Sequence, residues 1–388
     1  MTINQHQNLS NTYLSARRIT PLATQLIESI KRSGPISVAQ YVEACLKDPK
    51  FGYYIHSSAI GSASDFITSP EISQVFGELI GVWCTVVWNQ MGKPKKLNLL
   101  ELGPGRGTLM SDIMRTFAKS TEFQAHINLH LLESNNFLRR QQEDILKNKA
   151  PSLTHYKNTK SICEAALLTD APWIVIGNEF LDTFSVNQFI AQQNFWHERT
   201  VKCTSDNRLE FAIGKPAVPH FDIDFNASSI PDGEILETLP AIETIILPLL
   251  KTLMENAPLA VLLIDYGHES TGFGDTLQAI RAHRYEHPLT SPGQADLTTQ
   301  VDFSQISRVL RRSGLIPHSI LTQAEFLGRL GVVERTSQLM SNNPKQASVL
   351  ETATTRLIAP NGMGTRFKAL ALSSPKLHPL PIFMPLIM

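Results

Sequence analysis

The sequence has only four cysteines in 388 residues, and no two of them form a CxxC pair. A disulfide framework or a thiolate zinc site uses closely spaced cysteines, so we exclude both and expect a reducing compartment. The sequence also lacks a charge excess, because 35 basic residues balance 35 acidic ones. A balanced chain has no overall attraction to a phosphate backbone, so we expect no nucleic-acid partner.

Long apolar runs are absent as well. A membrane-spanning helix needs about 18 consecutive apolar residues, so we expect no membrane span. The most apolar long stretch, from Ile235 to Met254, contains Glu237, Glu243 and Lys251 and predicts a buried helix instead. A hydrophobic content of 42% is typical of a folded globular chain, organised as one decorated domain or as two.

Short aliphatic runs alternate with helical patterns through the middle of the chain. This alternation predicts an α/β fold, in which a Rossmann-like parallel sheet carries helices on both faces. Residues 20–50 read as an N-terminal helical extension, and the period-two pattern from Val186 to Ile213 predicts an antiparallel insertion. Apolar residues at three- and four-residue steps from Ile72 to Val87 predict a core helix, which a capping-box spacing at Thr68 would start. The predicted strands of the parallel sheet cover residues 97–102, 127–133, 173–177, 260–264 and a segment from 315, and a last strand covers 366–372.

The strongest local motif is a glycine-rich turn between a predicted strand and a predicted helix. Its glycines run as GxGxG from Gly103 to Gly107, whereas a dinucleotide fingerprint would place its third glycine at Thr108. Such a turn lets a ligand lie against backbone amides at the start of a helix. A sharp turn without a ligand also needs glycine, so the flanking residues decide between the two.

Two acids at the ends of successive strands indicate the cofactor. Glu101 precedes the first glycine and can accept hydrogen bonds from a cationic amino-acid ligand, and Glu133 can accept both hydroxyls of a ribose. A strand-end glutamate is otherwise a solvated loop residue. Together with the GxGxG turn, the pair predicts S-adenosylmethionine (SAM) as the cofactor.

Polar residues follow the strand at 173–177 in the order Asn178-Glu179-Phe180-Leu181-Asp182. In a SAM-binding sheet this edge faces the donor methyl group, so these side chains would meet the methyl acceptor. The alternative is a helix N-cap at Asn178 followed by a first-turn acid. We expect no metal, because His283 and His287 lack a third ligand.

The sequence resembles the MidA-like methyltransferases, a family that includes a mitochondrial arginine methyltransferase assisting assembly of respiratory complex I. The resemblance runs in family order from about residue 35 to 370. Its departures are Thr183-Phe184-Ser185, where the family commonly has Ala-Leu-Pro, and Ser64, where it often has glycine. The matching segments are Phe51-Gly52-Tyr53-Tyr54, Asp65 to Ser73, Glu101 to Thr108, Asn178 to Asp182, Asp265-Tyr266-Gly267, Gly274 to Ala279, Pro292 to Thr298, and Gly364 to Lys368.

The resemblance implies a SAM-dependent protein-arginine N-methyltransferase. Glu179 and Asp182, three apart on one expected helical face, would act as catalytic residues that orient the guanidinium toward the methyl group. The substrate site would add Glu71, Tyr266, Asp275 and His283. The expected cofactor contacts are Glu101, Gly103, Pro104, Gly105, Gly107, Thr108, Glu133, Asn178 and Thr68.

The sequence pattern also suggests three regions of the chain. Residues 1–90 would form the N-terminal helical segment and lid, 91–374 the methyltransferase domain with insertions at about 186–230 and 266–300, and 375–388 a proline-rich tail. We expect the 266–298 loop and Asp65 to Ser73 to close over the donor together. The tail should lie as an extended strap over an apolar groove.

The implied acceptor is a protein, with a respiratory complex I subunit as one candidate, and a homodimer stays open. We expect a cytoplasmic protein, with the mitochondrial matrix as the alternative. Two other functions also stay open, a non-catalytic SAM-binding assembly factor and a small-molecule methyltransferase.

Overall fold

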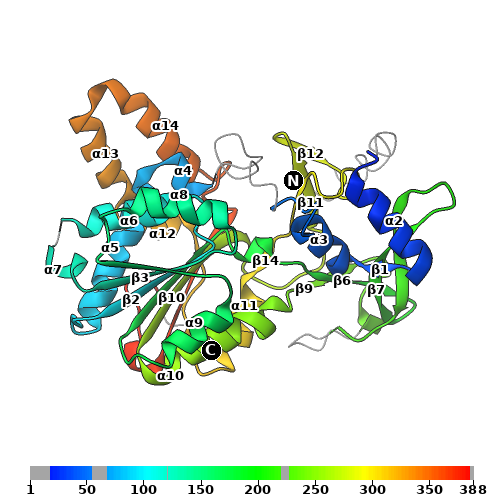
Figure 1. Ribbon diagram of the computed structural model, residues 1–388, viewed down its shortest axis with the longest axis horizontal. Helices are drawn as coiled ribbons and strands as arrows, with labels where there is room; N and C mark the ends of the chain where they lie inside the picture. Colours follow the sequence, from blue (N-terminus) through cyan, green and yellow to red (C-terminus); the bar gives the residue numbers. More distant parts are fainter. Residues whose placement is uncertain (1–17, 55–67, 120, 220–226, 385–388) are drawn as a thin grey trace. The chain divides into compact units, whose positions relative to one another are not determined.

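The computed structural model describes residues 18–54, 68–119, 121–219 and 227–384 (Figure 1). The chain forms two compact units, each assembled from three separate stretches. The smaller unit combines Met1–Phe66, Asp182–Ala241 and Gly272–Gln300, and the larger combines Ile67–Leu181, Ile242–Thr271 and Val301–Met388.

The larger unit is built on a mostly parallel sheet, as the sequence predicts. The strand order is β15-β17-β10-β5-β2-β3-β4, with β14 beside β10 and β16 beside β17. The neighbouring strands β10, β5, β2, β3 and β4 run parallel to one another, and β17 runs antiparallel to β10. Their bounds are β2 Leu97–Leu102, β3 Ile127–Leu132, β4 Ser152–Tyr156, β5 Trp173–Asn178, β10 Leu259–His268, β14 Val301–Asp302, β15 Ile316–Pro317, β16 Leu321–Thr322 and β17 Phe367–Ser373.

Helices cover both faces of this sheet (Figure 1). Every residue of β2, β5 and β17 is buried, which explains why these strands read as continuous apolar runs rather than as alternating ones. The helices are α4 Ser69–Ile72, α5 Gln74–Gln90, α6 Thr108–Phe117, α7 Thr121–Gln124, α8 Asn136–Leu146, α9 Thr159–Ala166, α10 Leu247–Asn256, α11 Phe303–Arg311, α12 Gln323–Arg329, α13 Val332–Asn342 and α14 Ala347–Ile358.

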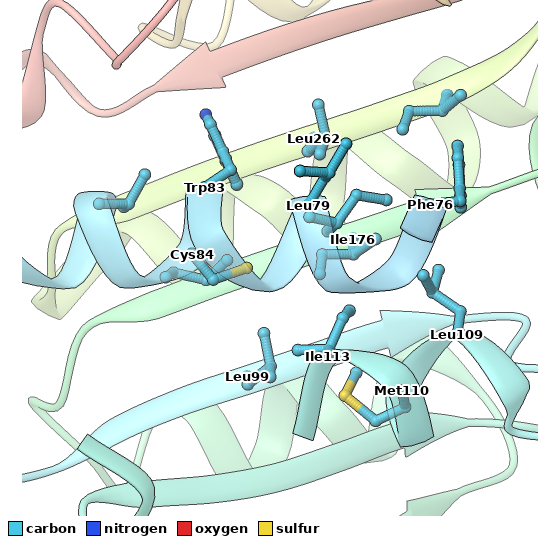
Figure 2. Packing of buried hydrophobic residues seen from close by; sticks show 14 of the residues in the cluster. Phe76, Leu79, Trp83, Cys84, Leu99, Leu109, Met110, Ile113, Ile176 and Leu262 are labelled. Carbon is cyan, nitrogen blue, oxygen red and sulfur yellow. The ribbon is translucent and has the colours of Figure 1, made fainter. Parts of the chain in front are cut away.

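The main core lies between the sheet and the helices α5 and α6. Figure 2 shows Leu79 and Trp83 of α5 and Ile113 of α6 in a cluster with Ile176 of β5 and Leu262 of β10. All of these side chains are almost completely buried. The three- and four-residue spacing that predicts a core helix here is therefore confirmed.

The predicted start of that core helix is wrong in one respect. The spacing around Thr68 suggests a capping box, but the Thr68 side chain makes no cap hydrogen bond. Ser73 adopts an extended conformation and separates the short α4 from α5, and its hydroxyl accepts a hydrogen bond from the amide of Val75. The chain therefore makes two helices, because Ser73 competes as a second N-cap.

The smaller unit contains an antiparallel sheet of order β1-β7-β6-β9, with β8 paired to β7. The predicted antiparallel insertion and N-terminal helices are confirmed. Leu22 of α2, Tyr41 of α3 and Val201 of β7 share one apolar core. The bounds are α2 Pro21–Ser33, β1 Ile36–Ser37, α3 Val38–Lys47, β6 Asn187–Gln192, β7 Phe195–Cys203, β8 Leu209–Pro216 and β9 Ile235–Thr238.

Two expectations about this part of the sequence are corrected. The apolar stretch from Ile235 to Met254, predicted as one helix, begins with the strand β9. A π-helical turn at Ile242–Ile246 then leads into α10. The stretch predicted as a long polar loop contains a second sheet of order β12-β11-β13, whose strands are β11 Gln278–Arg281, β12 Arg284–Glu286 and β13 Asp296–Thr298. Short strands with few alternating residues leave a weak sequence signal.

The described part of the proline-rich tail lies over the core of the larger unit. Leu377, Leu380 and Phe383 are buried in the same cluster as α5 and α12. The side-chain amide of Gln90 donates to the carbonyl oxygen of Leu377 at 3.2 Å. Pro385 and the lid residues 65–67 lie outside the described residues, and the joint closure of the lid segments stays a prediction.

Candidate functional site

The glycine turn joins β2 to α6 in the larger unit. Gly103, Gly105 and Gly107 have φ angles of 65°, 53° and 84°, a region that other residues enter at a cost. A Cβ at Gly103 would lie 2.8 Å from Cδ2 of Phe180, so this glycine is required by packing. A Cβ at Gly105 would meet nothing within 4 Å. The middle of the turn therefore faces space that a ligand can fill.

Glu101 lies in β2 just before this turn, and it is buried. Its Oε2 atom has no hydrogen-bond partner among the residues that the structure describes. Burial, with a smaller contribution from Glu133, raises the pKa of Glu101 to about 8. A buried carboxylate without a partner is costly, so the position favours a ligand that brings hydrogen-bond donors or positive charge.

Glu133 follows β3 directly and is also buried. Its Oε1 accepts a hydrogen bond from the amide of Asn135 at 2.7 Å, and its Oε2 accepts one from Gln142 at 3.4 Å. Burial raises its pKa although these hydrogen bonds oppose the shift. These bonds orient the carboxylate, which has acceptor sites for about four hydrogen bonds and so can also accept from a hydroxyl donor.

Asn178 and Glu179 follow at the end of β5. Glu179 Oε1 accepts hydrogen bonds from the amide of Ser69 at 2.9 Å and from the side-chain amide of Asn178 at 3.2 Å. The Oδ1 of Asn178 is buried and has no hydrogen-bond partner in the described part of the chain. This side-chain oxygen is a second acceptor available to a ligand.

The expected helical face carrying Glu179 and Asp182 does not form. Glu179 has a φ of 48°, and the next element is a 3-10 helix at Leu181–Thr183. Glu179 therefore lies before the helical turn, and Asn178 is not an α-helix N-cap either. Asp182 is buried and is the first residue of its segment of the smaller unit.

Three further predicted residues of the larger unit are Thr68, Glu71 and Tyr266. Thr68 is half-buried immediately before α4. Glu71 forms an ion pair with Arg106 of the glycine turn, at 3.5 Å between Oε1 and Nη1. The ring of Tyr266 packs edge-on against Phe367. An acceptor cation at Glu71 would have to compete with Arg106.

Two predicted substrate residues belong to the smaller unit. Asp275 accepts hydrogen bonds from Arg199 at 2.7 Å and from Gln188 at 3.0 Å, so its carboxylate already has a cationic partner. His283 is exposed at the two-residue turn between β11 and β12, with a φ of 60°. Neither is among the residues that the larger unit gathers at its strand ends.

Sequence reasoning missed two buried residues of the larger unit. Asp265, at the end of the regular part of β10, accepts hydrogen bonds from the amides of Leu181 and Tyr266, both at 2.9 Å. Gln142 of α8 donates to the carbonyl oxygen of Gly105 at 2.6 Å. The sequence pattern that could have identified Asp265 is an acid at the end of a predicted strand. Gln142 lies within a helix, and no sequence pattern there distinguishes it.

The larger unit thus collects the features that SAM requires. Open space lies beside Gly105, and a carboxylate oxygen of Glu101 and the amide oxygen of Asn178 have no partner among the described residues. These features fit a ligand with an ammonium group, and Glu133 fits a ribose. No cluster of metal-ligating side chains is found where the structure describes the chain.

Comparison with known proteins decides the family. A family model described as "Putative S-adenosyl-L-methionine-dependent methyltransferase" matches residues 79–321, more than half of the chain. The chain belongs to this family. It is a SAM-dependent methyltransferase with the corresponding Rossmann-like fold, and SAM is its cofactor.

Curated relatives match over almost the whole chain. Protein arginine methyltransferase NDUFAF7, mitochondrial, of Rattus norvegicus is 35% identical, covering 93% of this chain and 86% of the relative. The Homo sapiens protein of the same name is 34% identical, covering 91% and 83%. Both relatives are named as mitochondrial, and their names give no support to the cytoplasmic prediction.

A crystal structure of a Burkholderia thailandensis protein bound to S-adenosyl-homocysteine shares the fold. Its TM-score is 0.76 at 24% sequence identity, and the match covers 94% of this chain and 96% of that chain. At this identity the comparison shows the fold. No helix in the described ranges is long and apolar enough to cross a membrane.

Proposed function

We propose that this methyltransferase transfers the methyl group of SAM to an arginine side chain of a protein. Relatives named as protein arginine methyltransferases, at about one-third identity over most of both chains, are the observation that carries the proposal. The acids at the strand ends of the larger unit support it, because a guanidinium is a cation that carboxylates bind and orient.

The donor would be held by residues of the larger unit. Glu101 accepts hydrogen bonds from the ammonium group of the methionyl moiety, Asn178 Oδ1 provides a further acceptor, and Glu133 takes the ribose hydroxyls. The positive-φ turn follows Glu101 directly and leads into the start of α6, a place in the fold where backbone amides favour polar ligand groups. SAM supplies a methyl group already activated by its sulfonium, so the protein's task is positioning and charge complementarity.

Glu179 is the first candidate for orienting the acceptor. Two donors fix its Oε1, the amide of Ser69 and the side chain of Asn178, so the carboxylate has a defined direction at the strand end. Asp182 follows three residues later and would add a second acid. The carboxylates would hold the guanidinium so that one nitrogen points along the line of methyl transfer.

The family resemblance makes a respiratory complex I subunit the first acceptor to test. The names of the relatives favour the mitochondrial matrix as the compartment. A homodimer is a further hypothesis, which light scattering of the purified protein would check.

The test incubates the purified protein with methyl-labelled SAM and a protein extract, followed by mass spectrometry for methylarginine. With the wild-type protein we expect label in arginine side chains of protein. Glu179→Gln should lower the rate of transfer 100-fold or more, about the effect of losing one electrostatic contact. S-adenosylhomocysteine (SAH) affinity of that variant should change less than about threefold, since one carboxylate oxygen remains as an amide acceptor. Label confined to small molecules, or SAH binding without any transfer, would contradict the arginine proposal.

A further inference from the structure

Gln142 is a polar residue in the middle of the buried face of α8. The buried residues of this helix are Leu138, Gln142 and Leu146, spaced four apart, so a leucine-like residue would suit the pattern. Gln142 is fully buried. A buried amide costs stability unless its hydrogen bonds are made, so this side chain needs a reason to be there.

The hydrogen bonds of Gln142 join three parts of the larger unit. Its Nε2 donates to the Gly105 carbonyl oxygen at 2.6 Å and to Glu133 Oε2 at 3.4 Å. Its Oε1 lies 2.9 Å from Nε2 of His155 in β4. Both amide protons and the amide oxygen are thereby occupied, and His155 must carry its proton on Nε2 for this arrangement.

The same side chain also packs against the last glycine of the turn. A Cβ at Gly107 would lie 3.3 Å from Cγ of Gln142. Gln142 therefore contacts the glycine turn at two positions and Glu133 at one. These are the two halves of the donor site, and they come from different strands, β2 and β3.

We propose that Gln142 is a positioning residue that sets the discrimination of this enzyme for the ribose hydroxyls of SAM. It acts through Glu133, whose carboxylate it holds beside the glycine turn. With Gln142 in place, both Glu133 oxygens have a fixed donor, Asn135 on one and Gln142 on the other. The inference rests on the proposed donor site, in which Glu133 binds the ribose.

Calorimetry with two ligands tests this role. The probes are SAH and an SAH analogue that lacks both ribose hydroxyls. The wild-type protein should prefer SAH by about tenfold or more, the contribution of hydrogen bonds to a charged group. Gln142→Met keeps the length of the side chain but removes its donors, so we expect this preference to fall below about threefold, with most of the loss in SAH affinity.

A second variant and a matched control complete the experiment. Gln142→Asn keeps a buried amide but shortens its reach, so it should lower the preference in the same direction if Gln142→Met does not fold. Gln141→Met changes the neighbouring residue of α8, which is only partly buried, and should keep the wild-type preference.

The outcomes separate the inference from the proposed function. If the wild type discriminates and a folded Gln142 variant retains that preference, or loses affinity for both ligands equally, then Gln142 is a packing residue and the inference is overturned. If the wild type does not bind SAH, or binds both ligands alike, the proposed donor site fails and the inference fails with it.

Discussion

Glu101 should lose its proton when the cofactor binds. Its pKa of about 8 means that it is mostly protonated in the ligand-free protein at neutral pH, whereas a ligand ammonium group favours the ionised carboxylate. Binding then releases a proton, so SAH affinity should rise by up to about tenfold per pH unit between about pH 6 and pH 8 and level off above. Glu101→Gln should bind more weakly with no such slope. Calorimetry across this pH range in buffers of different ionisation enthalpy measures both effects, and a flat wild-type profile would count against the ammonium contact.

Gly105 is the other residue with a sharp expectation. Valine there would strain the backbone, because φ is 53°, and its side chain would enter the space beside the turn. SAH affinity should fall by more than about tenfold, which corresponds to about 1.4 kcal/mol. Gly92 also has a positive φ, and a Cβ there would meet nothing within 4 Å, but it follows α5 outside the candidate site, so Gly92→Val is the matched control. A loss of SAH affinity of the same size in both variants would show that backbone strain, and not the valine side chain in the site, explains the result.

Single elements of the larger unit are fixed by buried charges as well as by apolar packing. Arg335 of α13 forms an ion pair with Glu78 of α5 at 2.7 Å, and the Glu78 side chain is only 4% exposed, so the carboxylate depends on its partners. Arg335→Met should lower the free energy of unfolding by about 1.5–3 kcal/mol, the range for hydrogen bonds to charged groups, moderated because Arg115 stays 3.6 Å from Glu78. Arg356→Met, at an exposed position of α14, should change it by less than about 0.5 kcal/mol. Urea unfolding of both variants checks the difference, and a loss of equal size in both would remove the special role of Glu78.

Predictability from the sequence also differs between elements. The strands around Glu101 and Asn178 are apolar runs that end in polar residues, and a local pattern of this kind suffices to place them. The strands β9 and β11 were missed because four residues carry little periodicity. Gln142 was missed for another reason: its role comes from Gly105, 37 residues earlier, and from Glu133, and no pattern within α8 records those contacts. Glu179 was assigned to a helical face because the sequence does not reveal a positive φ at a residue other than glycine.

At the scale of the whole chain, the last described residues complete the core of the larger unit. One of the contacts that hold them is made by His318, which is fully buried and whose Nε2 accepts a hydrogen bond from the amide of Leu380 at 2.9 Å. The same histidine lies beside the ring of His378, and Phe383 packs edge-on against it. A protonated imidazole cannot accept the Leu380 hydrogen bond, so charge on His318 and attachment of the tail oppose each other.

The stability of the protein should therefore fall in mild acid. Burial, and then His378, lower the pKa of His318 to about 4, whereas an unfolded histidine titrates near 6.5. Between these values the unfolded chain binds the proton more tightly, so the stabilisation is complete above about pH 6.5 and is lost as the pH falls toward 4, by at most about 3 kcal/mol. His318→Gln places an amide oxygen near the position of Nε2 and does not titrate, so it should reduce this pH dependence. Urea unfolding of both proteins at about pH 7 and pH 5 measures the difference, and identical pH dependence in the two would show that other groups, not the histidine under the tail, govern acid stability.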